Sequence, residues 1–391
     1  MSGGVDSSLA AALLVEQGYD CVGVTMQVWP DYLPEAELEG GCCSLSAVED
    51  ARQVAARLGM PHYVANFRAE FQEKVIDNFV AEYAAGRTPN PCLVCNREIK
   101  FRALLERALE LGANYVATGH YARVQQDPIT GRFLLLRGID LTKDQSYALH
   151  NLTQDQLKRA LFPLGWMTKE KTRALARKKG LRVADKPDSQ EICFVPGNDY
   201  RRFLREHAPG AYKPGPILSL AGETLGQHDG IAFYTIGQRH GLGIAAEQPL
   251  YVVDIDPDEN AVIVGSKDDV WQDGLIASDV NWVAVPALKE PLSVQVKIRY
   301  NSQPMGCIFR PTERDAGADI SARVAGTGTR AGERAGEVEC LFSERARAVT
   351  PGQAAVFYDG DVVVGGGAIV RPIVRKGPVP VAVRSLRPRT Y

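Results

Sequence analysis

The chain has 391 residues, 45% of them hydrophobic and 24% charged, and its formal net charge is −2. That length allows two or three domains with separate cores, and no apolar run approaches the roughly 20 residues that a membrane span requires. Eight cysteines are too few for a disulfide scaffold, and no basic stretch followed by an apolar one suggests a signal peptide. We therefore expect a cytoplasmic protein, on which any surface for nucleic acid is local.

Residues 1–156 alternate predicted helices and strands. The predicted helices are Ser7–Gln17, Ala47–Leu58 (opened by a capping box of Ser46 and Glu49), and two more near 68–84 and 97–111. The predicted strands are Cys21–Val28, which is typical of a strand buried on both faces, His62–Asn66, Tyr115–Thr118 and Phe133–Leu136. This alternation predicts an α/β domain on a parallel sheet, with the ligand at the carboxyl ends of the strands.

The stretch Ser2–Ser8, "SGGVDSS", lies at the start of the first predicted helix. Its glycines leave backbone N–H groups bare, its serines add hydroxyls, and the positive end of the helix dipole points to the same place, which predicts a phosphate cradle. Because the loop lacks the lysine of G-x-x-x-x-G-K-[ST], a kinase-like or GTPase-like site is not expected. The pattern matches the pyrophosphatase (PP) loop of enzymes that adenylate a carbonyl oxygen; the structural alternative is a glycine turn with serine caps.

Two cysteines, Cys92 and Cys95, form a C-x-x-C just ahead of a predicted helix. A helix dipole at that place favours the thiolate. A structural zinc would need a second C-x-x-C or a pair of histidines at matching spacing, which the sequence lacks. A third thiol, Cys193, is by itself typical of a buried core cysteine, and Cys42 and Cys43 fit either local packing or a sulfur relay.

Residues 157–214 are predicted to form a small helical domain. Between positions 158 and 182, nine Lys or Arg accompany a single acid, Glu170. A solvated helix face is the simplest explanation of such a run. Its concentration in a net acidic chain favours instead a contact with a phosphate backbone.

Residues 215–370 change to short β runs with glycine turns, namely Leu250–Ile255, Ala261–Val264, Leu292–Tyr300, Ala354–Tyr358 and Val362–Ile369. They predict an all-β domain in the form of a small barrel. A Gly/Ala/Arg-rich stretch near 312–336 has no periodicity and is expected to be a disordered insertion. The basic segment 371–391 is expected to be an unstructured tail without an assigned function.

Eight stretches resemble the tRNA-specific 2-thiouridylases, bacterial enzymes that thiolate the wobble uridine of certain tRNAs. They are "SGGVDSS", "TPNPCLVCNREIKF" (88–101), "TGHYAR" (118–123), "KDQSYAL" (143–149), "DSQEICFV" (188–195), "YTIGQRHGLG" (234–243), "IRYN" (298–301) and "PGQAAVFYDG" (351–360). They occur in the family's order over nearly the whole chain. The resemblance implies a PP-loop ATPase domain over 1–156, a helical tRNA-binding domain over 157–214 and a β-barrel domain over 215–370.

The resemblance also implies roles for single residues. ATP with Mg²⁺ would bind at Ser2, Gly3, Gly4, Val5, Asp6, Ser7, Met26 and Gly119, Asp6 helping to hold the magnesium–triphosphate. tRNA would be contacted at Asn90 and Pro91 near the target base, and at His120, Lys143, Asp144, Gln145, Arg299, Tyr300 and Gln353. Cys95 would be the nucleophile and Cys193 the persulfide carrier, loaded by a sulfur-donor protein such as a cysteine desulfurase or a relay carrier.

The implied reaction adenylates O2 of uracil, after which sulfur from the Cys193 persulfide attacks C2, directly or as sulfide freed by Cys95. A Cys95–Cys193 disulfide would remain, and a reductant would reset it. Many members carry Asp at the position of Cys92. Three thiolates, of Cys92, Cys95 and Cys193, could instead hold a 4Fe–4S cluster with one iron open for sulfide, so both mechanisms stay open. The alternative functions are another PP-loop adenylating synthetase acting on a small molecule, and a non-catalytic ATP-binding module.

A phosphate loop of this kind normally follows a buried parallel strand, yet Met1 directly precedes the loop in this sequence. Loss of a central strand would leave buried backbone groups unpaired, at about 1–3 kcal/mol each. We therefore expect Met1 to be an internal methionine, with the natural start roughly 10–20 residues upstream.

Overall fold

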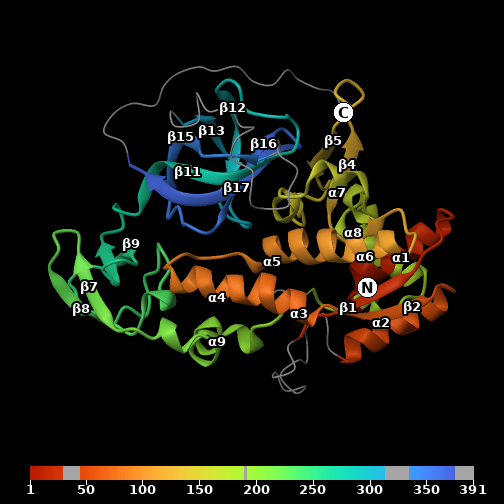
Figure 1. Ribbon diagram of the computed structural model, residues 1–391, viewed down its shortest axis with the longest axis horizontal. Helices are drawn as coiled ribbons and strands as arrows, with labels where there is room; N and C mark the ends of the chain where they lie inside the picture. The colour runs from red at the N-terminus through yellow and green to blue at the C-terminus, as the bar shows by residue number, and fades with distance from the viewer. Residues whose placement is uncertain (30–44, 189–191, 313–333, 375–391) are drawn as a thin grey trace. The chain divides into compact units, whose positions relative to one another are not determined.

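The computed structural model describes residues 1–29, 45–188, 192–312 and 334–374 (Figure 1). Two compact units divide the chain: unit 1 comprises Met1–Asp77 and Pro91–Tyr200, and unit 2 comprises Asn78–Asn90 and Arg201–Tyr391. Cys42 and Cys43, most of the stretch near 312–336 and the tail beyond 374 lie outside the described residues. No helix within the described ranges is both long enough and apolar enough to cross a membrane.

Unit 1 contains two parallel strand pairs. β1 (Gly23–Gln27) pairs with β2 (His62–Asn66), in register from Gly23 opposite His62 to Gln27 opposite Asn66. β3 (Val116–Ala117) pairs with β6 (Ala160–Leu161). The parallel sheet is therefore confirmed, although among the described strands none joins the two pairs. The expected upstream strand stays a prediction.

Two details of the predicted sheet are wrong. β1 is not buried on both faces, because every second residue of it is only half-buried and β2 is largely exposed. The predicted strand Phe133–Leu136 corresponds to β5 (Phe133–Arg137), which forms an antiparallel hairpin with β4 (Ala122–Gln126) rather than a further parallel strand. A buried Asp127 holds the hairpin turn by accepting hydrogen bonds from Ile129 N and Thr130 Oγ1, so the local turn decides the antiparallel pairing.

The helices of unit 1 flank these strands (Figure 1). In chain order they are α1 (Val5–Glu16), α2 (Leu45–Arg57), α3 (Arg68–Phe71) continued by the π-helical η2 (Gln72–Ile76), α5 (Pro91–Val94) continued by the π-helical η3 (Cys95–Ala103) and α6 (Leu104–Glu110), α7 (Gln154–Lys158) and α8 (Lys169–Lys178). Short 3₁₀ turns lie at η4 (Ser146–Leu149), η5 (Pro163–Trp166), η6 (Arg182–Asp185) and η7 (Pro196–Asn198). α2 already includes Ser46, so the predicted capping box does not open that helix.

One apolar cluster joins α1 to the segment that follows β6. Val5, Leu9 and Ala10 of α1 share this core with Ala176 of α8 and with buried residues of the turns on either side. Leu164 and Val183 are such residues, 0% and 4% exposed. The packing therefore places α8 directly on the helix that carries the predicted phosphate loop.

Unit 2 holds α4 (Asp77–Ala84, from Asn78), α9 (Tyr200–His207, from Arg201), the turns η8 (Pro209–Ala211) and η9 (Ile231–Phe233), and two separate sheets. The first sheet has the order β8-β7-β10-β9, with β7 (Gly215–Ser219), β8 (Thr224–His228), β9 (Tyr251–Asp256) and β10 (Ala261–Gly265). The predicted single β domain over 215–370 thus divides in two.

The second sheet is a closed six-stranded barrel, which confirms the predicted fold class of the C-terminal region. Its order is β11 (Trp271–Trp282), β15 (Val338–Arg347), β13 (Met305–Pro311), β12 (Leu292–Lys297), β16 (Ala354–Asp359) and β17 (Val362–Ile373), which pairs back with β11; β14 (Arg334–Ala335) adds to β11. Phe309 stacks between Trp282 and Phe357 in its core, at centroid distances of 5.8 and 4.6 Å. Closure leaves no free strand edge in this ring.

Candidate active site

Two serines, Ser2 in the loop before α1 and Ser7 in the first turn of α1, are hydrogen-bonded to each other. Ser7 Oγ accepts a hydrogen bond from Ser2 N at 3.1 Å and lies 3.2 Å from Ser2 Oγ. Gly3 adopts a φ of +65°, and a Cβ there would lie 2.2 Å from the carbonyl oxygen of Ala47, so this position requires glycine. Gly4 caps α1 without a side-chain bond, which leaves the first N–H groups of a 12-residue helix available to an anion.

Gly119 lies against this loop, and its part in nucleotide binding stays a prediction. A Cβ on Gly119 would be 2.6 Å from the carbonyl carbon of Asp6 and 2.7 Å from Ser7 N. Met26 lies near the carboxyl end of β1, opposite Ala65. The structure therefore brings Gly119 to the predicted phosphate loop, while the role of Met26 stays a prediction.

The carboxylate of Asp6 is held by two side chains that the sequence analysis did not single out. Lys169 Nζ, from the first turn of α8, donates to both oxygens of Asp6 at 2.8 Å. The hydroxyl of Tyr121 donates to Asp6 Oδ1 at 2.8 Å and lies 3.0 Å from Thr172 Oγ1. Burial raises the pKa of Tyr121, and the charge of Asp6 raises it further, so the phenol stays a donor at neutral pH.

Lys169 also binds a second carboxylate, that of Asp188, at 2.8 Å. Asp188 in turn accepts from Arg173 Nη2 and Lys143 Nζ, each at 2.9 Å. Partial burial by itself would raise the pKa of Asp188, but the hydrogen bonds from Lys169 and Lys143 outweigh it and lower the pKa to about 2. The result is a continuous charge network from the loop, through α8, to the segment that precedes Cys193.

Another lysine reaches the loop from the same segment. Lys186 Nζ donates to the carbonyl oxygen of Gly3 at 3.3 Å and to Asp50 Oδ2 at 2.8 Å. Arg173 Nη1 holds the backbone there by donating to the carbonyls of Ala184 and Lys186 at 2.8 and 2.9 Å. Part of the basic run predicted to meet a nucleic-acid backbone therefore faces the phosphate loop.

Cys92 and Cys95 lie inside a helix rather than ahead of one, which corrects the sequence prediction. The helix begins at Pro91, where proline suits the first position because its missing N–H would have no partner. Cys92 is exposed and falls in the first turn, and Cys95, half-buried, opens the π-helical stretch η3. Interruptions of this kind occur often at functional sites.

Cys193, half-buried, belongs to the same unit as Cys95. The ring of its neighbour Phe194 packs edge-on against Phe71 of α3 at 5.7 Å, and α3 contacts η3. Within the described ranges, no three His, Cys, Asp or Glu side chains gather into a group that could hold a metal ion. Cys92, Cys95 and Cys193 therefore do not fit an iron–sulfur cluster as they stand, and no step is derived through one.

The residues of unit 1 expected to contact tRNA have diverse surroundings. His120 is half-buried and lies 2.7 Å from Thr118 Oγ1; burial lowers its pKa well below the usual value, and Lys100 adds to this, so its ring is neutral at pH 7. Gln145 Oε1 accepts from Tyr121 N at 2.9 Å. Asp144 is buried and accepts from backbone N–H groups of its own turn. Pro91 is buried at the helix start, and Lys143 holds Asp188.

In unit 2 three expected tRNA residues lie on the barrel domain. Arg299 and Tyr300 are exposed just after β12, and Arg299 Nη2 donates to the carbonyl of Arg347 at 2.7 Å. Gln353 Nε2 donates to the carbonyl of Thr88 at 3.0 Å. Thr88 N also donates to Pro351 O at 2.9 Å, so the segment leading to the half-buried Asn90 is fixed on the barrel of the same unit.

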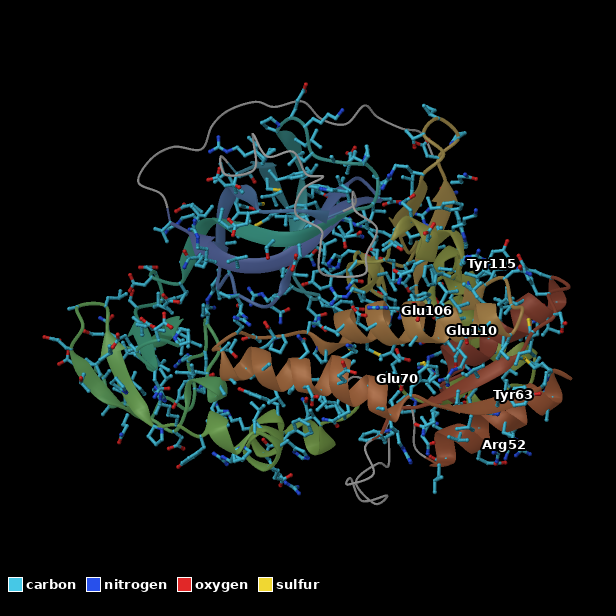
Figure 2. All side chains as sticks on the ribbon, in the orientation of Figure 1. Arg52, Tyr63, Glu70, Glu106, Glu110 and Tyr115 are labelled. Carbon is cyan, nitrogen blue, oxygen red and sulfur yellow. The ribbon has the colours of Figure 1, made fainter. Side chains whose placement is uncertain are left out.

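Several glutamates lie on the surface of unit 1 at α3 and α6 (Figure 2). Figure 2 shows Glu70, Glu106 and Glu110 on α3 and α6, and Arg52 and Tyr63 on α2 and β2. Glu106 and Glu110 are exposed, and the side chain of Glu70 is 42% exposed. Glu70 and Glu106 are paired with Arg107 and Arg102 at 3.9 and 3.8 Å, so their charges are balanced locally.

The fold and the site together define the class of protein. One chain carries an α/β unit, with the loop predicted to bind phosphate and a C-x-x-C helix, and β domains that follow it. Residues 1–197 match the family described as tRNA methyl transferase HUP domain, 201–266 the tRNA methyl transferase PRC-barrel domain, and 329–369 the aminomethyltransferase beta-barrel domain.

Curated relatives cover nearly the whole chain. The tRNA-specific 2-thiouridylase MnmA of Heliobacterium modesticaldum is 54% identical over 379 residues, 97% of this chain and 93% of that protein. Those of Symbiobacterium thermophilum and Carboxydothermus hydrogenoformans are 54% and 52% identical, over 95% and 94% of this chain and 91% and 96% of their own lengths. The chain belongs to the family of tRNA-specific 2-thiouridylases, as the sequence predicted.

Gly119→Ala should weaken nucleotide binding at least tenfold, because the added Cβ would displace the backbone of Asp6 and Ser7 by contact closer than 3 Å. Isothermal titration with ATP measures this effect. Gly210→Ala is the matched control, since its Cβ would meet no atom within 4 Å; equal affinity of the two variants would contradict the placement of Gly119.

Asp188→Asn should lower the free energy of unfolding at pH 7. The folded-state pKa is depressed, so the stabilisation is fully present above the unfolded-state pKa of about 3.9 and is lost as the pH falls through about 2. Urea titrations from pH 7 to pH 3 should show the difference between wild type and variant shrinking at the acid end. Asp185→Asn removes an exposed pair with Arg177 and should change stability by only about 0–1 kcal/mol. A difference for Asp188→Asn that is constant with pH would rule out this account.

Proposed function

We propose that this protein catalyses the ATP-dependent 2-thiolation of the wobble uridine of tRNA. The observation that carries the proposal is the presence of a phosphate-cradling loop and the helix of Cys92 and Cys95 in one compact unit. The relatives are named tRNA-specific 2-thiouridylases, which supplies the substrate and the product. A small-molecule ligase would need neither the cysteines nor exposed basic helices.

In the first step, O2 of the uracil ring attacks the α-phosphorus of ATP and pyrophosphate leaves. The bare N–H groups of α1 and the hydroxyls of Ser2 and Ser7 would bind phosphate oxygens. Asp6 offers a carboxylate for Mg²⁺, an ion that needs only one or two protein carboxylates beside phosphates and water and that would neutralise phosphate charge. Adenylation turns O2 into part of a good leaving group, AMP.

In the second step, the terminal sulfur of a persulfide on Cys193 adds to C2, and the C2–O2 bond breaks to release AMP. The thiolate of Cys95 then attacks the Sγ of Cys193, and the sulfur on C2 leaves with its electron pair as 2-thiouridine. A Cys95–Cys193 disulfide remains, and an external thiol reductant supplies the two electrons that reset it. A sulfur-donor protein reloads Cys193, and tRNA is held at Asn90 and at the exposed Arg299 and Tyr300.

Two assays separate the proposal from the two other functions and from the other mechanism. Pyrophosphate release that requires added tRNA supports the proposal; release with a small molecule alone would indicate a synthetase, and ATP binding without release a non-catalytic module. Iron content and the visible spectrum of anaerobically purified protein separate a cluster from a persulfide enzyme.

Cys95→Ser and Cys193→Ser should each abolish 2-thiouridine formation and leave ATP affinity unchanged, because the thiols act after the phosphate site is filled. Cys92→Asp should retain activity if sulfur travels as a persulfide, and should lose iron if three thiolates hold a cluster. Mass spectrometry of digested tRNA measures the product. Near wild-type thiolation by either serine variant would refute the assigned roles.

Neutralising exposed lysines of α8 should weaken tRNA binding. Lys171 and Lys178 are exposed, whereas Lys179 is paired with Glu16. Lys171→Gln with Lys178→Gln should reduce the slope of log affinity against log salt by about 1.4–1.8, since each phosphate contact contributes about 0.7–0.9. Lys74→Gln, on a helix segment beside Glu73, is the control and should not alter the slope. An unchanged slope in the double variant would exclude this surface.

A further inference from the structure

The loop of this protein has no lysine of its own, although a bound triphosphate would bring about four negative charges to it. Backbone N–H groups and a helix dipole supply only partial charges. An ammonium group that neutralises the charge of the phosphates must therefore come from another helix, strand or loop. Among the described residues, two lysines reach the loop: Lys186 at the carbonyl of Gly3 and Lys169 at the carboxylate of Asp6.

Lys169 is the better placed of the two. Its side chain is 11% exposed, and it enters the site from the first turn of α8, which packs on α1. The side chain of Lys186 is 37% exposed and is committed to Asp50. Burial strengthens the electrostatic attraction of Lys169 to an anion, because water screens it less.

The contacts of Lys169 also allow it to change partner without leaving the site. Asp6 holds the ammonium from the loop side, and Asp188 holds it from the other side at 2.8 Å. If Asp6 takes another partner, Asp188 still keeps the charge at the loop. The low pKa of Asp188, about 2, ensures that this second carboxylate is ionised at every physiological pH.

We propose that Lys169 is a ligand of the β- and γ-phosphates of ATP, acting as the lysine that the PP loop itself lacks. In this structure its charge is balanced by Asp6 and Asp188, and when ATP binds its ammonium moves from Asp6 to a phosphate oxygen. The inference rests on the proposed use of ATP. It predicts that Lys169 recognises ATP and pyrophosphate and is indifferent to AMP.

Isothermal titration of Lys169→Gln tests this directly. We expect ATP and pyrophosphate, each with Mg²⁺, to bind about 10- to 100-fold more weakly than to wild type, the usual effect of one charge-assisted bond, and AMP to bind within about twofold. Arg177→Gln removes a positive charge from an exposed position on the same helix and should change none of the three affinities. Equal losses for ATP and AMP, or no loss, would overturn the role of Lys169.

A second measurement uses the wild-type protein and so does not depend on the folding of the variant. An acyl-phosphate derivative of ATP transfers its acyl group to an amine beside the γ-phosphate, with ATP as the leaving group. Peptide mass spectrometry should find the acyl group on Lys169, lost with excess ATP and kept with excess AMP; labelling of Lys186 alone would overturn the assignment. Failure of wild type to bind ATP would refute the proposed function itself.

Discussion

The ammonium of Lys169 between the carboxylates of Asp6 and Asp188 is the interaction on which the site of unit 1 depends. The side chain of Lys169 is 11% exposed, whereas those of Asp6 and Asp188 are 33% and 24% exposed, so water screens these ion pairs in part. The same ammonium, from the first turn of α8, therefore links Asp6 of α1 to Asp188. Arg173 reinforces this by holding the backbone of residues 184 and 186 as well as Asp188. The phosphate loop and the segment that leads to Cys193 are thereby linked by charge rather than by apolar packing alone.

A second constraint acts at the other cysteines. Thr88 is hydrogen-bonded to Pro351 and Gln353 of the barrel domain, and the helix of Cys92 and Cys95 begins three residues later at Pro91. Proline at 89 and at 91 stiffens the intervening backbone. Gln353 therefore unites an expected tRNA contact with the support of the segment that carries Asn90.

Local patterns predicted much of this structure. The strand His62–Asn66 has the predicted bounds because it lies between a helix-ending glycine, Gly59, and the helix that starts at Arg68. Gly119 lies beside the loop of Ser2–Ser8, where only glycine tolerates the contacts, and phosphate binding by this loop stays a prediction. The pairing of β5 was missed, since a parallel and an antiparallel partner can use the same apolar run and the turn at Asp127 decides between them. The division of residues 215–370 into two sheets was missed for a similar reason, because the residues of one strand do not determine which strands pair with it.

The basic run between 158 and 182 shows why the site could be only half predicted. A net charge describes how many cations a segment has, whereas function depends on which of them already have a carboxylate. Lys169 contacts Asp6 and Asp188, and Arg173 contacts Asp188. Both carboxylates lie outside the basic run, so a count of charges within the run could not assign these cations to the phosphate loop. Lys171 and Lys178 lie on the exposed side of the same helix and stay candidates for the predicted contact with a phosphate backbone. One amphipathic helix can thus present cations to two anions: its inner face to the phosphates of a nucleotide, and its outer face to the backbone of a nucleic acid.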